Sequence, residues 1–571
     1  MRSSLVIRIR ILCGFFIVIA VLLSIRLYFL QIVNGERYQN DAMGQYVAPS
    51  SDTDVRGNIY FTSKDGTLVA AAVMESGWRI AIKPKDLVDA ESTYTALSAE
   101  TPIDKERFMA SAAKTADPYE EVAFRVSDEA GTRIRTKKLK GVLLVADQWR
   151  SYPAGKIAAQ TVGFVGYTGD TKAGVYGLER AWNNTLVHTA SGLYVNPFAE
   201  IFSNVAALIT SNPAEHQGDV ITSIEPLVEA QLEKTLDEVM RTYSPRQAGG
   251  IVMDPSTGEI VAMAMRPTFD PNTYNTISDP SIFSNALVEG RYELGSIMKP
   301  LTVATGIDLG AITPETTYDD RGCIERSTYT ICNFDHKARG VVSMQEVLSQ
   351  SLNLGVTYVV DKTGHKEFTR YMHALGLGTK TGIDVPNEVT GDLSPLKEGN
   401  APAVNYAAAA FGQGVSVSPI EMIRALSALA NGGTLPHPHV VSAIRYQTGV
   451  TRTLHATSGP QVYKPETATT VTNMLVKVFD TALLKGVLKQ EHHAIAAKTG
   501  TAQISKPGGG YYSDRYLHSF FGYFPAHEPR FIVFLFTIEP HGQEFASATL
   551  ARPFLDITQY LINYYDIPPD R

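Results

Sequence analysis

Strand patterns at both ends of one long region constrain the fold more than any other feature. Gly249-Gly-Ile-Val-Met253 and Glu259-Ile-Val-Ala-Met-Ala264 flank Asp254-Pro-Ser-Thr-Gly258, which is a strong hairpin signal. Near the C-terminus, residues 530–538 are almost continuously apolar, as in a buried strand. Helical patterns lie between these strands, and an amphipathic pattern over Glu225–Tyr243 precedes them. The sequence therefore predicts an α+β domain.

The first 33 residues predict a membrane anchor. Residues 1–10 hold three arginines and no acid, and an apolar run follows over residues 11–33. As a helix this run is about 34 Å long, enough to cross a bilayer. A basic leader favours a cytoplasmic tail at 1–10 and an exported body. A cleavable signal peptide is the alternative, but no small-residue cleavage site follows the apolar core.

The exported body divides into two parts. Residues 34–215 are mixed and loop-rich, and Asp54–Tyr60 with Lys64-Asp65-Gly66 predicts two short strands around a turn. The pattern changes near Gly218. We therefore expect a pedestal domain at 34–215 and a second domain at 216–571.

Charge and cysteine content exclude some functions and leave one question open. A net charge of −7 gives no sign of nucleic-acid binding. The histidines show no metal-ligand spacing, so neither a metal nor a cofactor is expected. Cys323 and Cys332 lie nine positions apart in the exported part. They form either a local disulfide worth about 2–3 kcal/mol or two free thiols.

The segment Tyr292–Pro300 carries the parts of a covalent acyl-transfer site. If a helix begins near Ser296, Lys299 lies one turn further on the same face. Pro300 supports that start, because proline is tolerated only in the first turn. Ser296 then has an amine within reach and the positive end of a helix behind it.

The Ser-x-x-Lys pattern alone is weak, since it occurs at Ser111, Ser296 and Ser394. Of the three, Ser296 alone follows a glycine and precedes a helix-starting proline. Lys-Thr-Gly also occurs three times, at residues 362, 380 and 498. The third copy, Lys498-Thr499-Gly500-Thr501, follows small apolar residues typical of a strand beside a cleft.

With Ser351-Leu352-Asn353 between them, these motifs resemble the penicillin-binding protein and serine β-lactamase superfamily. The resemblance implies an antiparallel sheet flanked by helices in 216–571. Further features resemble class B, monofunctional penicillin-binding proteins over nearly the whole chain. These are the anchor, Arg56-Gly57-x-Ile59, Gly177-Leu-Glu179, the 249–264 hairpin and Phe411-Gly-Gln-Gly414.

Two details refine the resemblance. Glu293 and the phrase Gly414-Val-Ser-Val-Ser-Pro419 look like the division, or septal, type. Leu294 departs from the family, which usually has proline before Gly-Ser, and Leu352 replaces the commoner serine. Neither departure removes a reactive group.

The resemblance implies a role for each site residue. Ser296 attacks the carbonyl between the terminal D-alanines of a peptidoglycan stem peptide, and Lys299 takes its proton. This requires a neutral amine, so burial and the Lys498 cation must lower a pKa of about 10.4. Ser351 relays the proton to the leaving amine, while Asn353 donates to Lys299 or to the substrate amide.

The resemblance also assigns the strand that carries the third motif. Lys498, Thr499 and Thr501 bind the terminal carboxylate of the substrate, and Gly500 lets it approach the strand. The N–H groups of Ser296 and Thr501 form the oxyanion hole.

These roles predict a membrane-anchored D,D-transpeptidase that cross-links septal wall, with its catalytic domain outside the cytoplasmic membrane. β-Lactams would act on it as covalent inhibitors. No glycosyltransferase domain is visible, so the resemblance implies a SEDS-family polymerase as partner. The alternatives are an elongation-type transpeptidase, a D,D-carboxypeptidase or β-lactamase, and a non-enzymatic wall-synthesis scaffold or β-lactam sensor. An intact set of motifs argues against a catalytically silent scaffold. A cytoplasmic tail of ten residues is too short for the output domain that a sensor needs.

Overall fold

The computed structural model describes residues 55–169, 171–188, 217–326, 329–454 and 459–571. The predicted tail at 1–10 and the anchor at 11–33 lie outside these residues. Within the described ranges, no helix is both long and apolar enough to cross a membrane.

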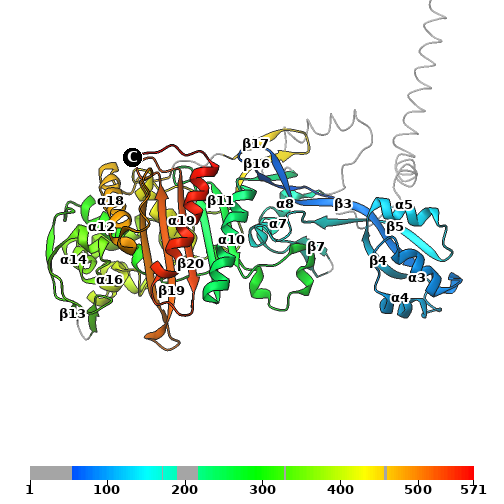
Figure 1. The fold of residues 1–571 in the computed structure, drawn as a ribbon, viewed down its shortest axis with the longest axis horizontal. Helices are drawn as coiled ribbons and strands as arrows, with labels where there is room; N and C mark the ends of the chain where they lie inside the picture. The colour runs from blue at the N-terminus through cyan, green and yellow to red at the C-terminus, as the bar shows by residue number, and fades with distance from the viewer. Residues whose placement is uncertain (1–54, 170, 189–216, 327–328, 455–458) are drawn as a thin grey trace, which may run out of the picture. The chain divides into compact units, whose positions relative to one another are not determined.

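A five-stranded antiparallel sheet forms the centre of the C-terminal part (Figure 1). In spatial order its strands are β11 (Ile260–Arg266), β10 (Gln247–Met253), β20 (Phe531–Ile538), β19 (Tyr511–Phe524) and β18 (Ala496–Ser505). The predicted hairpin is β10–β11, and Gly258 provides the positive φ of its turn (+84°). The strand predicted near the C-terminus is β20, which pairs with β10. The α+β prediction is confirmed.

Strand β20 shows why its sequence lacks alternation. Ile532, Phe534 and Phe536 belong to the core on one face of the sheet. Phe531 and Leu535 belong to the core on the other face. A strand buried on both faces needs apolar residues at every position, because successive side chains point to opposite faces.

Two long helices cover one face of this sheet. Helix α10 (Pro226–Tyr243) packs on β11, and α19 (Ala546–Tyr564) packs on β19 and against α10. The carboxylate of Glu225 caps α10 by accepting from the N–H of Val228 at 2.7 Å. The amphipathic helix predicted over Glu225–Tyr243 thus begins one residue later, at a proline suited to the first turn.

A larger helical region covers the other face and carries the candidate nucleophile. Its helices are α11 (Ala286–Glu289), α12 (Lys299–Asp308), α13 (Met344–Ser349), α14 (Asn353–Thr363), α15 (His365–Ala374), α16 (Ala403–Ala410), α17 (Pro419–Ala430) and α18 (Pro465–Lys477). Short 3-10 turns are η4 (Pro271–Thr276), η5 (Pro280–Phe283), η6 (Gly295–Met298), η7 (Ser394–Gly399) and η9 (Leu483–Gly486), and η8 (Val478–Ala482) is a π-helical turn. Two two-stranded ribbons, β12 (Thr317–Asp320) with β15 (Gly340–Ser343) and β13 (Cys323–Arg326) with β14 (Tyr329–Cys332), precede α13 and α14.

A seven-stranded sheet links the N-terminal part to the rest. Its path is β17 (Thr451–Thr453), β16 (Val441–Tyr446), β9 (Gly218–Thr222), β2 (Ile59–Thr62), β3 (Leu68–Ile82) and β4 (Glu120–Val126), and β5 (Val142–Ser151) also pairs with β3. The turn predicted around Lys64–Gly66 joins β2 to β3, but β3 is 15 residues long rather than short. Because β2 lies beside β9, the sheet crosses the predicted domain boundary at 215/216, which itself stays a prediction.

The N-terminal part has its own small core and short connecting elements. Helices α3 (Ala90–Ser98), α4 (Lys105–Ala112) and α5 (Asp128–Thr136) pack on β3, β4 and β5, next to the 3-10 turn η2 (Pro84–Asp86). The remaining elements are β1 (Val55–Arg56), α6 (Ala159–Val162), β6 (Val165–Thr168), β7 (Thr171–Gly174), α7 (Gly177–Ala181), α8 (Asn183–Leu186) and β8 (Val187–His188).

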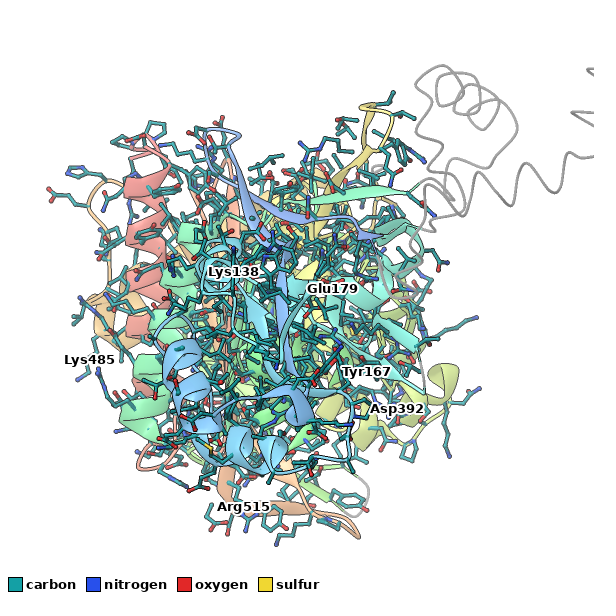
Figure 2. All side chains as sticks on the ribbon, turned by 90° about the vertical axis from the view of Figure 1, so that its right-hand side faces the viewer. Lys138, Tyr167, Glu179, Asp392, Lys485 and Arg515 are labelled. Atoms are coloured by element: carbon teal, nitrogen blue, oxygen red, sulfur yellow. A yellow bond between two sulfur atoms is a disulfide. The ribbon has the colours of Figure 1, made fainter. Side chains whose placement is uncertain are left out.

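Two motifs singled out in the N-terminal sequence meet at a buried carboxylate. Glu179, labelled in Figure 2, accepts from the Nε groups of Arg56 and Arg150, each at 2.6 Å. Burial alone would raise the pKa of Glu179, but the charges of Arg150 and Arg56 outweigh it and lower that pKa. The carboxylate therefore ties β1 and β5 to α7 through a paired, buried charge.

Candidate active site

Ser296 lies in a 3-10 turn, η6, that leads directly into α12. The helix predicted to begin near Ser296 thus begins as this tighter turn, and Pro300 occupies the first turn of α12 as expected. Gly295 has φ of +66°, and a Cβ there would lie 2.8 Å from the carbonyl oxygen of Thr501. A glycine is required because the turn packs against β18.

Lys299 is completely buried at the start of α12. Its Nζ donates to the carbonyl oxygen of Ser351 and, at 3.1 Å, to the Oγ of the same residue. Burial, and then the charge of Lys498, lower the pKa of Lys299 well below its ordinary value. The environment of Lys299, one turn from Ser296, therefore favours the neutral amine.

Lys498 approaches the same hydroxyl from the edge strand β18. Its Nζ donates to the Oγ of Ser351 and to the carbonyl of Thr499, at 3.0 Å in each case. Burial lowers the pKa of Lys498 to about 7. One hydroxyl thus bridges two lysines whose pKa values are both depressed.

Ser351 sits in a strained position between α13 and α14. Its φ is +56°, a left-handed conformation that side chains other than glycine seldom adopt. Asn353 begins α14, and its Nδ2 donates to the carbonyl oxygen of Cys332 at 2.8 Å. The predicted bond from Asn353 to Lys299 or to a substrate stays a prediction.

The remaining motif residues lie along β18. A Cβ on Gly500 would meet the Oγ of Ser519 at 2.3 Å and the carbonyl of Leu294 at 2.6 Å, so only glycine fits there. Thr501 Oγ1 accepts from the N–H of Ala546 at 3.1 Å, which fixes the start of α19 beside the strand. Leu294, the departure from the family pattern, is buried and accepts a 2.7 Å bond from Ser519.

A cavity of about 870 Å³ brings the candidate residues together. Its lining includes Ser296, Ser351, Asn353, Lys498, Thr499 and Thr501. Lys299 lies behind this surface, bonded to Ser351. The other Ser-x-x-Lys strings differ: Ser111 and Lys114 both bond to Glu120 in the N-terminal part, and Ser394 begins η7.

Several lining residues carry no signal in the sequence. They are Phe334, His336, Arg339, Gln503, Tyr516, Glu544 and Phe545. They come from loops and strand ends far apart in the chain, so no spacing joins them. The rings of Phe334 and Phe545 meet edge to face, with centroids 5.8 Å apart.

The cysteines left open by the sequence form a disulfide at the rim of this cavity. Cys323 and Cys332 face each other across β13–β14, with Cα atoms 4.1 Å apart. His336 Nδ1 lies 3.7 Å from the Cys323 sulfur. The three side chains are close enough to hold a metal ion. Because the disulfide removes both thiolates, this cluster does not form a metal site.

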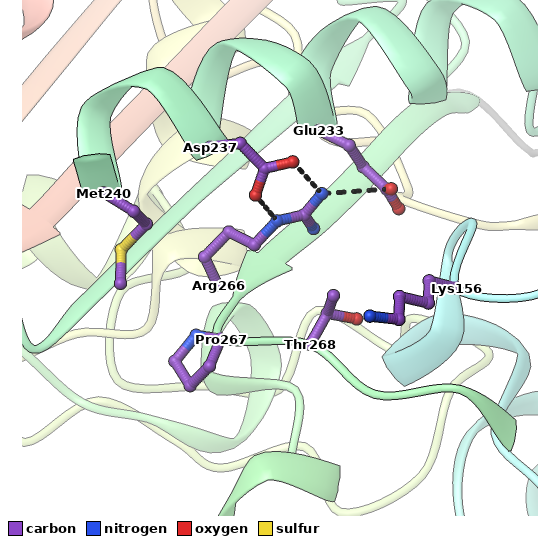
Figure 3. Close-up of a pocket in the computed structure, with 7 residues that line it drawn as sticks. All are labelled: Lys156, Glu233, Asp237, Met240, Arg266, Pro267 and Thr268. Carbon is purple, nitrogen blue, oxygen red and sulfur yellow. Dashed lines mark hydrogen bonds and ion pairs between the residues drawn. The ribbon is translucent and has the colours of Figure 1, made fainter. Parts of the chain in front are cut away.

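A second cavity, of about 420 Å³, lies between α10 and the segments that carry Lys156 and Thr268 (Figure 3). Arg266 pairs there with Asp237 and Glu233 on α10, while Lys156 and Thr268 lie across the opening. None of its lining residues belongs to the three motifs. The arrangement is an ion-pair network at the junction of two segments, without the parts of an acyl-transfer site.

Comparison with known proteins identifies the class. The model of the penicillin-binding protein transpeptidase domain matches residues 248–558, and that of the penicillin-binding protein dimerisation domain matches residues 53–196. The chain belongs to the penicillin-binding protein transpeptidase family. This confirms the resemblance drawn from the motifs and the predicted class of enzyme.

Relatives and solved structures agree with that assignment. Stage V sporulation protein D of Bacillus subtilis is 27% identical over 95% of this chain and 83% of its own length. Peptidoglycan D,D-transpeptidase FtsI of Buchnera aphidicola from Schizaphis graminum is 24% identical over 98% of this chain and 95% of its own length.

Two solved structures share the fold. Penicillin-binding protein 2X of Streptococcus thermophilus has a TM-score of 0.71 at 21% identity, covering 90% of this chain and 80% of that one. Penicillin-binding protein 3 of Mycobacterium tuberculosis, complexed with aztreonam, has a TM-score of 0.68 at 21% identity, covering 90% and 97%.

Proposed function

We propose that this chain is a class B peptidoglycan D,D-transpeptidase that uses Ser296 as its nucleophile. The observation that carries the proposal is the shared hydroxyl of Ser351, held by Lys299 at 3.1 Å and Lys498 at 3.0 Å in the cavity that Ser296 lines. The names of the relatives, which describe peptidoglycan D,D-transpeptidases, support the substrate class.

Acylation begins when the Oγ of Ser296 attacks the carbonyl carbon of the penultimate D-alanine. Lys299 accepts the hydroxyl proton, and burial favours the neutral amine that this step requires. The N–H groups of Ser296 and Thr501 stabilise the oxyanion, a device worth about 3–4 kcal/mol per donor. The C–N bond then breaks, and the leaving amine of the last D-alanine takes a proton through Ser351.

The substrate carboxylate binds at β18. Lys498 supplies the cation, and the hydroxyls of Thr499 and Thr501 donate to the carboxylate oxygens. A bound anion raises the pKa of Lys498, so the substrate holds this lysine in its charged form. The charge of Lys498 in turn keeps Lys299 neutral.

The acyl group leaves when an amine from a neighbouring stem peptide attacks the ester. A hydrolase would instead deliver the acyl group to water. We expect a long-lived penicillin adduct, because a transpeptidase excludes productive water attack. A deacylation half-life below seconds would favour the carboxypeptidase or β-lactamase alternative.

We further propose that residues 11–33 anchor the enzyme as a single span, with residues 1–10 cytoplasmic and 34–571 outside the membrane. The septal role rests on Glu293 and Gly414–Pro419. In this scheme a SEDS-family polymerase supplies the glycan strands. Midcell localisation of a fluorescent fusion supports the septal role, and sidewall localisation supports the elongation alternative.

The nucleophile is tested by labelling the protein with a fluorescent penicillin and locating the adduct by peptide mass spectrometry. We expect one adduct, on Ser296, which Ser296→Ala abolishes. Ser111→Ala is the matched control from another Ser-x-x-Lys string and labels at the normal rate. Normal cross-linking in cells carrying only Ser296→Ala would favour the scaffold alternative.

A further inference from the structure

Helix α14 begins without a capping side chain of its own. The residue before it is Leu352, which cannot accept a hydrogen bond from the first turn. This start lies between Ser351 and Asn353, so its position decides where both side chains point. Something else in the structure must satisfy its N–H groups.

The missing cap comes from Asn333, which directly follows the β13–β14 hairpin and lies 21 residues before Leu354. The Oδ1 of Asn333 accepts from the N–H of Leu354, the second residue of α14, at 3.2 Å. The neighbouring carbonyl of Cys332 accepts from the Nδ2 of Asn353 at 2.8 Å. The last residue of the hairpin and the residue directly after it thus hold two adjacent residues of the helix.

Asn333 is itself held rigidly. Its Nδ2 donates to both carboxylate oxygens of Asp320, at 2.9 and 3.0 Å, and its own N–H donates to the carbonyl of Gly322 at 2.9 Å. Both Asn333 and Asp320 are only 1% exposed. The disulfide at Cys332 closes the hairpin immediately before Asn333. The side-chain amide therefore has one orientation, with its oxygen toward α14.

We propose that Asn333 is a positioning residue for acylation, acting as a non-local cap that fixes Ser351 and Asn353 opposite Ser296. The left-handed φ of Ser351 supports this, because a strained residue persists only where its surroundings over-determine it. The inference rests on the roles proposed above for Ser351 and Asn353. It adds a residue that lies outside all three motifs.

The test reverses the Asp320–Asn333 pair. Asn333→Asp keeps an acceptor for Leu354 but sets two buried carboxylates face to face, so we expect displacement of the cap. Adding Asp320→Asn restores a donor and an acceptor with their positions exchanged. Stopped-flow labelling with a fluorescent penicillin separates the affinity of the initial complex from the rate constant of acylation.

For Asn333→Asp we expect the acylation rate constant to fall by about tenfold to a hundredfold, as for a small misplacement of catalytic groups. The initial affinity stays unchanged, because β18 supplies the carboxylate site. The double variant recovers the wild-type rate constant. Equal acylation by Asn333→Asp and wild type, or no recovery in the double variant, overturns the inference.

A control separates positioning from general loss of stability. Asp384→Asn weakens a half-buried carboxylate that accepts from the N–H groups of Val440 and Val441 at 2.7 Å, away from the cavity. It lowers the melting temperature without changing acylation. If its acylation falls as much as that of Asn333→Asp, the effect is structural and the inference fails. Labelling that survives Ser296→Ala would instead refute the proposed function.

Discussion

Lys299 and Lys498 have the same side chain and share one hydrogen-bond partner, yet the proposed mechanism requires opposite charge states for them. Both are buried, and burial lowers both pKa values. The charge of Lys498 lowers the pKa of Lys299 further. Placing two positive charges around one hydroxyl is unfavourable. The state in which only one of the two lysines is protonated to the cation is therefore favoured over the state with two cations. The arrangement thus favours the two different charge states that the proposed mechanism requires.

This charge separation predicts a pH-dependent affinity. The pKa of Lys498 in the free enzyme is about 7, so its cation is lost as the pH rises through that value. The initial complex with a β-lactam carboxylate should therefore weaken between about pH 6 and pH 9, by up to tenfold per pH unit above the pKa. The acylation rate constant should not fall over this range, because Lys299 acts as a neutral base. Stopped-flow labelling at a series of pH values measures both quantities.

Lys498→Arg provides the control, because guanidinium stays charged throughout this range. Its initial affinity should be lower at neutral pH but independent of pH. An unchanged affinity of the wild type up to about pH 9 would contradict the assignment of Lys498 as the carboxylate-binding cation.

At the scale of elements, helices and strands set by local sequence patterns were predicted, and features set by tertiary contacts were not. Helix α10, the β10–β11 hairpin and β20 were predicted because periodicity and turn residues are properties of short segments. The start of α12 differed, since contact with β18 tightens the chain at Gly295 into a 3-10 turn. The non-local cap of α14 joins residues 21 apart through side chains that the motif patterns do not include.

The motifs of the candidate site could likewise be predicted from short segments, whereas the contacts between those segments could not. Its three motifs are short strings whose order along the chain carries the resemblance. The left-handed conformation of Ser351 and the bond from Asn353 to Cys332 depend on the packing of a distant hairpin. Whether the cysteines pair also depended on the register of β13 and β14, which composition cannot give.

The packing of β18 against η6 predicts a large effect for Gly500→Ala. The new methyl group would overlap the carbonyl of Leu294 and the hydroxyl of Ser519, which are already bonded to each other. We expect a loss of about 1–3 kcal/mol in the free energy of unfolding and about a hundredfold loss in acylation. Urea unfolding and penicillin labelling measure the two effects.

Gly382→Ala is the matched control. It also strains a glycine, with φ of +82°, but no atom lies within 4 Å of its added Cβ. It should lower stability while leaving acylation unchanged. Similar loss of acylation in both variants would show that stability, not the β18–η6 contact, accounts for the result.

Helix α10 predicts a pH-dependent stability. Burial, and then the nearby charge of Glu233, raise the pKa of Glu229 from 4.5 to about 8. A carboxyl whose pKa is raised by folding stabilises the protein fully below the unfolded value and loses that contribution as the pH rises through the folded value. Glu229 should therefore destabilise the protein increasingly between about pH 5 and pH 8.

Glu229→Gln removes this charge and should reduce that slope. Its carbonyl can keep the bond that Glu229 accepts from the N–H of Met263 at 2.7 Å. At about pH 9 we expect the variant to be more stable than the wild type by about 1–3 kcal/mol. Urea unfolding at several pH values checks this, and parallel curves for the two proteins would refute it. Arg266, Glu233 and Asp237 form an ion-pair network beside this part of α10, and Lys156 lies across the same cavity.

At the scale of the whole molecule, one sheet joins the two predicted domains. Strand β2 lies between β9 and β3, and one apolar core contains residues from both sides of the 215/216 boundary. Phe164 from the N-terminal side stacks on Tyr274 and meets Phe269 and Phe283 edge to face. Part of the predicted pedestal is therefore built into the core of the C-terminal part.

This shared core predicts that residues 216–571 do not form a stable unit alone. Without residues 34–215, β9 would lack its parallel neighbour β2. The aromatic face around Phe269 would also be exposed. Each large side chain uncovered costs about 1.5–3 kcal/mol. Produced separately, the fragment should aggregate or melt well below a 55–571 fragment, as measured by size-exclusion chromatography and thermal unfolding. A monomeric 216–571 fragment with the same melting temperature and the same acylation rate would show instead that the boundary separates independent domains.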